Sequence, residues 1–116
     1  MAVDFMTQNA GDLLKQFKAR IEQSEAKGKI TTWMLSEDKQ DFTHKSDNWK
    51  YLAWFQPAVK NDRLTFNIIK TKGQNVSTVA YSYYHGHLIE TFLNHFDTEF
   101  SSAVATAMPT ADDLVG

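Results

Sequence analysis

The sequence predicts an α+β domain: an antiparallel meander of four strands, or five, with an N-terminal and a C-terminal helix packed on one face. Two segments, residues 10–27 and 85–100, repeat apolar residues at helical spacing, and the residues between them alternate as strands do. The links between the strands are short, which favours antiparallel neighbours. At 116 residues, the chain fits one domain over 1–116.

The first helix is expected over residues 10–27, after a loose N-terminus at residues 1–9. Its apolar positions fall within one arc of about 100° around the helix axis. These positions are Ala10, Leu13, Leu14, Phe17 and Ile21. Asn9 is suited to cap the start of this helix, and Gly28 is suited to end it.

A β-branched and aromatic run at residues 30–35 predicts the first strand. The polar segment that follows, residues 36–48, would be long for a structureless link in a compact domain. It is therefore either a functional loop or an extension of the strands on each side. We favour the extension of at least one strand around Phe42.

The clearest strands form a hairpin over residues 49–56 and 63–71, which are separated by a short polar turn. Another strand is expected over residues 75–83, where large and small side chains alternate.

The second helix is expected over residues 85–100, with its apolar residues in one arc of about 140°. The segment 101–108 permits either a helix, because of its alanines, or a short last strand, because of Val104 and Thr106. Residues 109–116 are expected to form a frayed tail.

Strand alternation divides the predicted sheet into two faces. The face expected under the helices carries Trp49, Tyr51, Ala53, Phe55, Leu64, Phe66 and Ile68. The opposite face carries Leu52, Trp54, Thr65, Ile69, Tyr81 and Tyr83. This second face is too apolar and aromatic for an ordinary solvent face, so it indicates an interaction surface. The alternative is that the N-terminus, the 36–48 segment or the tail covers it.

We therefore expect a non-enzymatic protein-interaction module that forms a homodimer, or binds a protein or peptide partner, through this face. A small enzyme or ligand-binding protein is the alternative, with a pocket between the second helix and the sheet near Tyr83, Tyr84, His85 and the 36–48 loop. The residues predicted for the interface or ligand site are Leu52, Trp54, Ile69, Tyr81, Tyr83, Tyr84 and His85.

No pattern in the sequence predicts a catalytic residue, a metal site or a cofactor. The chain has no cysteine, no nucleophile elbow, no phosphate-binding glycine loop and no zinc-protease motif. The one cluster of side chains that suggests a metal site is formed by His85, His87, Glu90 and His95. On a helix, His87 and His95 lie about 12 Å apart along the axis, which is too far to share one ion.

Charge also limits the class of partner. The net charge is −2, but residues 1–72 hold all 12 basic residues with nine acids, whereas residues 73–116 hold five acids and no base. A nucleic-acid binder usually has a basic excess, so a nucleic-acid partner is not expected. No apolar run of about 18 residues predicts a membrane span, and no signal-peptide pattern is present. A cytoplasmic location is expected.

Overall fold

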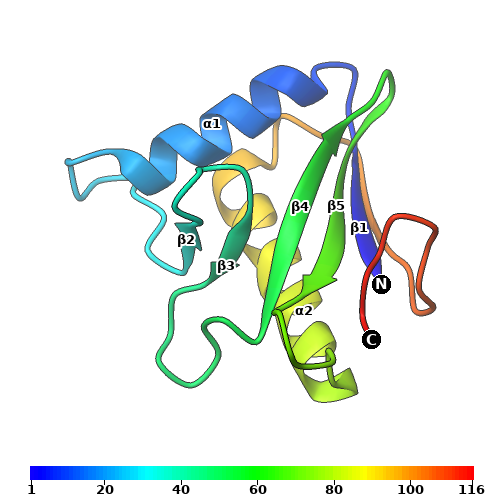
Figure 1. The fold of residues 1–116 in the computed structure, drawn as a ribbon. Helices are drawn as coiled ribbons and strands as arrows, with labels where there is room; N and C mark the ends of the chain where they lie inside the picture. The colour runs from blue at the N-terminus through cyan, green and yellow to red at the C-terminus, as the bar shows by residue number, and fades with distance from the viewer.

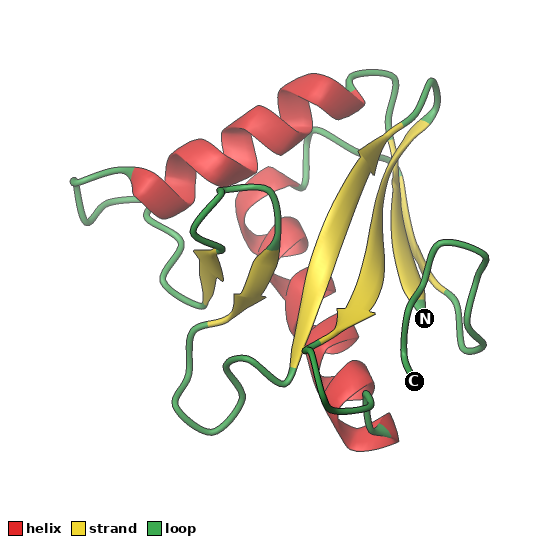
Figure 2. Cartoon of the chain, viewed as in Figure 1, coloured by secondary structure: helices red, strands yellow, loops and turns green.

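The computed structural model describes residues 1–116 and contains one six-stranded antiparallel sheet with two helices (Figures 1 and 2). In chain order the elements are β1 Ala2–Met6, α1 Ala10–Glu22, β2 Trp33–Leu35, β3 Phe42–His44, β4 Ala53–Val59, β5 Arg63–Lys70, α2 Thr78–Phe96 and β6 Ser102–Ala105. The strands lie in the order β2-β3-β4-β5-β1-β6. The α+β class and the antiparallel sheet are confirmed, but the sheet has six strands rather than four or five.

The central hairpin of β4 and β5 follows the expected alternation. Phe55 pairs with Ile68 and Ala53 with Lys70. Of the seven side chains expected on the core face, Ala53, Phe55, Leu64, Phe66 and Ile68 are fully buried, whereas Trp49 is half-buried and Tyr51 is exposed. Strand β4 begins at Ala53 rather than at residue 49, because the chain makes turns before Ala53.

Both helices pack against the side of the sheet that carries Phe66. The Phe66 ring lies 5.8 Å from the ring of Phe17 in α1 and 5.6 Å from the ring of Phe92 in α2. In Figure 1, α2 crosses behind β4 and β5. The opposite face of the sheet, which we call the outer face, is therefore not covered by a helix.

Helix α1 ends at Glu22 rather than at residue 27. The backbone amide of Ile30 donates a hydrogen bond of 3.0 Å to the carbonyl of Arg20, so the chain folds back over the end of the helix. Ile30 is 2% exposed. The helix therefore ends before the stop that Gly28 predicts, because the chain turns back to bury Ile30.

The 36–48 segment contains a strand around Phe42, but this is the separate three-residue strand β3 rather than the expected extension of a flanking strand. Strand β3 pairs with β2 over its three residues, and Phe42 also pairs with Phe55 of β4. The residues between β2 and β3 form a tight turn, closed by a hydrogen bond from the amide of Ser36 to the carbonyl of Asp41.

The prediction of a loose N-terminus at residues 1–9 was wrong. Residues 2–6 form β1, which lies between β5 and β6. Val3 and Phe5 are fully buried, and the Phe5 ring stacks on Phe92 with 4.0 Å between ring centres. The strand is short and its partners lie far away in sequence, so its local pattern alone could not reveal it.

The predicted strand at residues 75–83 was also wrong, because α2 begins at Thr78. The side chain of Ser77 caps the helix by accepting a hydrogen bond of 3.1 Å from the amide of Ala80. Ala80, Tyr84 and Leu88 then follow one another at helical spacing and are all buried. Residues 78–83 fit both the two-residue period of a strand and the period of a helix. The contacts of Ala80 and the following buried residues with the core select the helix.

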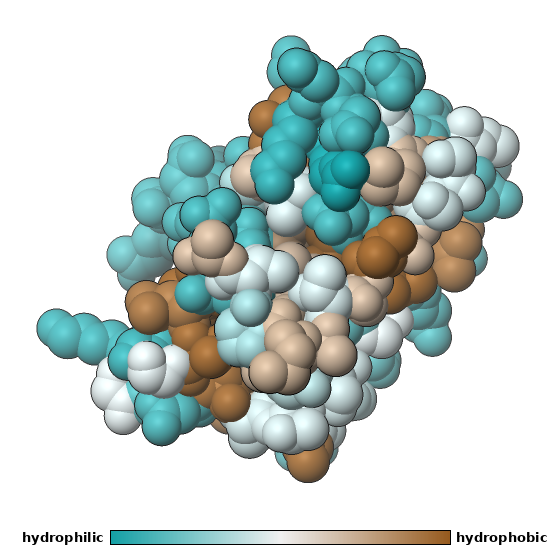
Figure 3. All heavy atoms as spheres, turned by 90° about the vertical axis from the view of Figure 1, so that its right-hand side faces the viewer, coloured by the Kyte–Doolittle hydropathy of each residue, from teal (hydrophilic) through white to brown (hydrophobic).

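The segment left open at residues 101–108 contains a strand, β6, which pairs with β1. The tail expected to fray is ordered: Leu114 forms a parallel bridge with Ile69 of β5. The tail thus occupies the place beside β5 where β1 has ended, since β1 pairs no further than Asn67. Figure 3 views the molecule from this side and shows hydrophobic patches separated by more polar residues.

Candidate functional site

Trp54 lies on the outer face of the sheet. Its neighbours in β4, Ala53 and Phe55, point into the core, so the indole ring points away from the helices. The ring borders two hollows of about 450 and 370 Å³. We call the two together the Trp54 groove, which is lined by Met34, Leu35, Ser36, Glu37, Asp38, Asp41, Tyr51, Trp54, Ile69 and Lys70.

One part of the Trp54 groove is aromatic. The rings of Tyr51 and Trp54 lie 5.8 Å apart at an angle of 32°. The ammonium group of Lys50 lies 5.7 Å from the centre of the Tyr51 ring, so this ring already faces one cation.

The other part of the groove is acidic. A hydrogen bond from the Ser36 hydroxyl, together with the amide of Gln40, lowers the pKa of Asp38. Burial raises the pKa of Asp41, and the charge of Asp38 raises it further. Oδ1 of Asp41 is buried and has no hydrogen-bond partner. The groove therefore presents aromatic rings beside negative charge that is only partly compensated.

The two segments that border the groove also hold the chain's two non-glycine residues with positive φ. These are Lys39, with φ of 61°, in the β2–β3 turn, and Tyr51, with φ of 64°, beside Trp54. The amide of Tyr51 donates a 3.0 Å hydrogen bond to Oγ1 of Thr43, and its carbonyl accepts bonds from Thr71 and Gln74. These contacts hold a bulky residue in a disfavoured conformation.

The structure brings together only some of the predicted interface residues. Trp54 and Ile69 face each other across β4 and β5 on the outer face. Leu52 packs against the hydrophobic core. The other four belong to α2 and do not lie on the outer face: Tyr81, Tyr83, Tyr84 and His85.

Sequence reasoning missed Tyr51 and Met34 as groove residues. Alternation along one continuous strand over residues 49–56 predicts that Tyr51 lies on the core face, but the strand begins only at Ala53. Its positive φ breaks that alternation and leaves its side chain 45% exposed. The acidic residues of the groove lie in the segment 36–48, for which a functional loop was one of the two interpretations.

A second cluster joins β3 to α2 through imidazole and aromatic rings. The Tyr83 ring stacks on Trp49 on one side, at 3.8 Å, and on His87 on the other, at 4.0 Å. Nε2 of His44 lies 3.5 Å from Nδ1 of His87. His44 is 3% exposed, and burial, followed by the proximity of His87, lowers its pKa.

The tautomer of His44 decides what this cluster can do. Nδ1 of His44 accepts a hydrogen bond of 3.1 Å from the amide of Ser46, so neutral His44 carries its proton on Nε2. This Nε2–H points to His87 and leaves no lone pair there for a metal ion. No group of three or more His, Cys, Asp or Glu side chains is placed to hold a metal, and this includes the cluster of His85, His87, Glu90 and His95.

Tyr84 and His85, which define the alternative pocket, have structural contacts. Tyr84 is fully buried, and its hydroxyl bonds with the hydroxyl of Thr43 and the carbonyl of Trp49. Nδ1 of His85 donates to the carbonyl of Tyr81 at 2.6 Å, and its Nε2 is buried without a partner. Burial lowers the pKa of His85.

None of the hollows on the surface includes Tyr83 or Tyr84. His85 borders a shallow one of about 270 Å³ between α2 and residues 105–107. The fold and the groove thus define a small α+β domain with an open surface site.

No protein-family model, curated protein or solved structure is significantly similar to this chain. Neither helix is both long and apolar enough to cross a membrane.

Proposed function

We propose that this chain is a protein-interaction module whose Trp54 groove binds a segment of a partner protein that carries a basic side chain. The observation that carries the proposal is the strained backbone of Tyr51 beside the half-buried Trp54 ring. Residues in disfavoured conformations persist mainly where surrounding contacts maintain them for binding or catalysis. Here the strain presents an aromatic ring at the edge of a groove.

The aromatic rings and carboxylates of the groove favour a positively charged ligand. Lysine and arginine side chains are attracted to the faces of Trp and Tyr, and carboxylates add charge-assisted hydrogen bonds. Glu37, Asp38 and Asp41 line one hollow with Lys70 as the single base. A long basic side chain could lay its methylene stem along Trp54 and reach the carboxylates with its charged end.

Partner binding fits the outer face better than pairing of two whole sheets through that face. Away from Trp54, the outer face is polar: the hydroxyl of Thr65 donates to Asp4, and the amide of Asn67 donates to Asp113. One exposed apolar side chain lies away from the groove on this face, Val104, which is 47% exposed opposite Asp4. The expected cytoplasmic location remains a prediction.

Titration with charged peptides tests the proposal. Backbone amide and indole N–H signals of the protein are followed by NMR while tetralysine, tetra-arginine or tetraglutamate is added, so that binding can also be measured without Trp54. We expect saturable shifts of the Trp54 signal with both basic peptides and none with tetraglutamate. Trp54→Ala should weaken binding of the basic peptides about tenfold or more, as for an aromatic residue at the centre of an interface.

Val59→Ala is the matched control, because Val59 is 54% exposed on the same strand and lies outside the groove. It should leave peptide affinity unchanged. Equal binding of tetraglutamate, or basic-peptide affinity that Trp54→Ala does not alter, would contradict the proposed function.

A further inference from the structure

The loop between β3 and β4, residues 45–52, is attached to α2 by aromatic and polar contacts. Figure 1 shows that this loop extends beyond the end of β3. The Trp49 ring stacks on the Tyr83 ring with 3.8 Å between ring centres, and the carbonyl of Trp49 accepts a hydrogen bond from the Tyr84 hydroxyl. None of these groups changes charge between about pH 5 and pH 8.

A further attachment runs through two imidazole rings, which do change charge in this range. The amide of Ser46 donates to Nδ1 of His44 at 3.1 Å, and Nε2–H of His44 faces Nδ1 of His87 at 3.5 Å. Each ring therefore faces an N–H donor at one of its nitrogens. A protonated imidazole carries a hydrogen on both nitrogens and accepts from neither. Protonation of His44 thus sets two donors against each other at Ser46, and protonation of His87 does so between the two rings.

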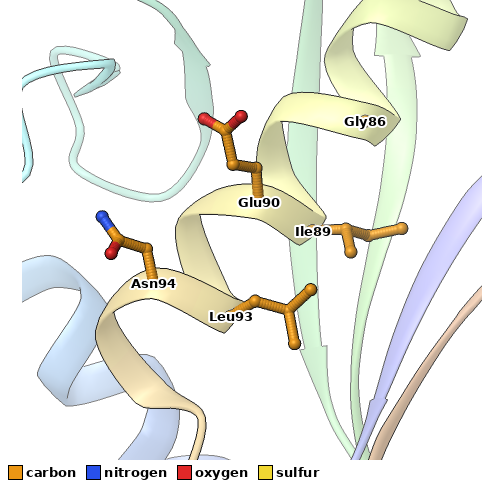
Figure 4. Close-up of a pocket in the computed structure, with 5 residues that line it drawn as sticks. All are labelled: Gly86, Ile89, Glu90, Leu93 and Asn94. Atoms are coloured by element: carbon orange, nitrogen blue, oxygen red, sulfur yellow. The ribbon is translucent and has the colours of Figure 1, made fainter.

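The surroundings of this pair do not compensate a positive charge. His44 is 3% exposed, and burial and His87 lower its pKa, which no carboxylate raises. The side chains that face it are aromatic rings of β2 and α2, namely Trp33, Tyr83, Tyr84 and His87. Glu90, one turn after His87, is the only carboxylate of α2; it is exposed and extends away from the helix (Figure 4). The carboxylate of the loop, Asp47, is also exposed and pairs with Lys50 at 3.4 Å.

The loop also carries the aromatic part of the Trp54 groove. The carbonyl of Ser46 accepts hydrogen bonds of 3.0 and 2.8 Å from the amides of the two residues that precede Tyr51. The amide of Tyr51 donates to Thr43, which precedes His44 in β3. The contacts that hold Tyr51 at positive φ therefore adjoin the contact between His44 and Ser46.

We infer that the His44–His87 pair releases the β3–β4 loop from α2 when the solution becomes mildly acidic, and that this release weakens the Trp54 groove. In the released loop both imidazoles meet water, where histidine binds a proton near pH 6.5. The released state therefore binds protons more tightly than the attached state, so acid shifts the equilibrium toward release. The effect on the groove rests on the proposed function, whereas the release of the loop does not.

NMR of the wild type at pH 7.5 and pH 5.0 tests the release without a ligand or a variant. The nuclear Overhauser contact between the rings of Trp49 and Tyr83 should be present at pH 7.5 and lost at pH 5.0. The amide signals of residues 45–52 should move toward random-coil positions as the ring signals of His44 and His87 titrate. The amide signals of β5 should stay at their folded positions, which distinguishes local release from global unfolding.

Two variants separate the pair from other histidines. In His44→Asn, the side-chain oxygen takes the place of Nδ1 and accepts from Ser46 at every pH, so the contact between Trp49 and Tyr83 should persist at pH 5.0. His95→Gln is the matched control, because His95 is a half-buried histidine of α2 whose pKa is also lowered by burial. It should lose the contact as the wild type does.

Titration with tetra-arginine, whose charge is the same at pH 7.5 and pH 5.0, tests the effect on the groove. The affinity of the wild type should fall about tenfold at pH 5.0 if a tenth of the molecules keep the loop attached. The fall should be less than about threefold in His44→Asn, in which the loop stays attached. The raised pKa of Asp41 is a competing cause, so Asp41→Asn should lower affinity at both pH values and keep the tenfold fall.

Three results would overturn the inference. They are a contact between Trp49 and Tyr83 that survives at pH 5.0 in the wild type, its equal loss in His44→Asn, and a fall in affinity that disappears in Asp41→Asn but remains in His44→Asn. If tetra-arginine does not bind even at pH 7.5, the proposed function fails, and the contact between Trp49 and Tyr83 alone decides whether the loop is released.

Discussion

At the scale of single residues, the polar atoms of the buried aromatic side chains are matched with nearby partners. Nε1 of Trp33 donates to Oγ1 of Thr91 at 2.9 Å, and the hydroxyl of Tyr84 bonds with Thr43. Large aromatic residues can fill a small core only if their polar atoms find such partners. The buried histidines are different, because a change of charge would disrupt their contacts.

His44 is predicted to make stability depend on pH. Its pKa is lowered because burial, and then His87, disfavour the charged ring. A group with a lowered folded-state pKa contributes stability above its unfolded pKa, near 6.5, and that contribution is lost as pH falls. We expect the free energy of unfolding to decrease from pH 7.5 to 5.5, and to decrease less steeply in His44→Gln. Urea unfolding at each pH measures this.

The slope should not vanish in His44→Gln. Burial also lowers the pKa values of His85 and His95, so these residues act in the same direction. Lys45→Gln, at an exposed neighbouring position, provides the control and should keep the wild-type slope. Identical slopes for His44→Gln and the wild type would show that His44 does not drive the dependence.

At the scale of elements, the C-terminal tail completes the sheet beside β5. The amide of Lys70 donates to the carbonyl of Leu114, and the amide of Val76 donates to the carbonyl of Val115. Asp113 fixes the start of this contact, because its carboxylate accepts bonds from the side chain of Asn67 and the amide of Ile68. The Met1 ammonium also lies 3.3 Å from this carboxylate.

Asp113→Ala should lower the free energy of unfolding by about 2–3 kcal/mol, since several hydrogen bonds to a charged group are lost and the side chain of Asn67 keeps only its bond to Thr110. Burial alone would raise the pKa of Asp113, but bonds from Thr110, Asn67 and Ile68 outweigh it and lower the pKa. Its contribution is therefore present above the unfolded pKa and lost as pH falls. Urea unfolding at pH 7 and pH 3 measures both effects.

Asp112→Ala is the matched control, because Asp112 is the exposed neighbour of Asp113. It should change stability by less than about 0.5 kcal/mol, as is usual for surface substitutions. If the two alanine variants were equally stable, the tail would contribute nothing through Asp113.

At the scale of the whole molecule, the sheet separates two open surfaces. The Trp54 groove lies on its outer face, and a hollow lined by Gly86, Ile89, Glu90, Leu93 and Asn94 lies on α2, in the helix layer that covers its inner face. Sites this far apart, without shared contacts, are expected to act independently.

We therefore expect Gly86→Glu, on the far side of the molecule, to leave the peptide affinity of the Trp54 groove within about twofold of the wild type. The NMR titration, run on Gly86→Glu and on the wild type, checks this. A loss of peptide binding in Gly86→Glu would mean that the far side of α2 is coupled to the groove.

The sequence by itself determined those parts of the fold whose pattern is local. Neighbouring residues are enough to predict the first helix from its apolar period. Strand alternation in the same way predicts that Phe55 and Phe66 point into the core and that Trp54 points outward. The same local pattern was ambiguous in Val79, Tyr81 and Tyr83, which alternate as in a strand but lie in α2.

Only the tertiary structure decided the features that depend on distant partners. Strand β1 and the tail at Leu114 are ordered by β5, which lies more than 40 residues away along the chain. The positive φ of Tyr51 is maintained by contacts with Thr43 and residues beyond β5, so the aromatic part of the groove could not be read from alternation. Local sequence specifies which periods a segment can adopt, whereas burial against residues far along the chain selects among them.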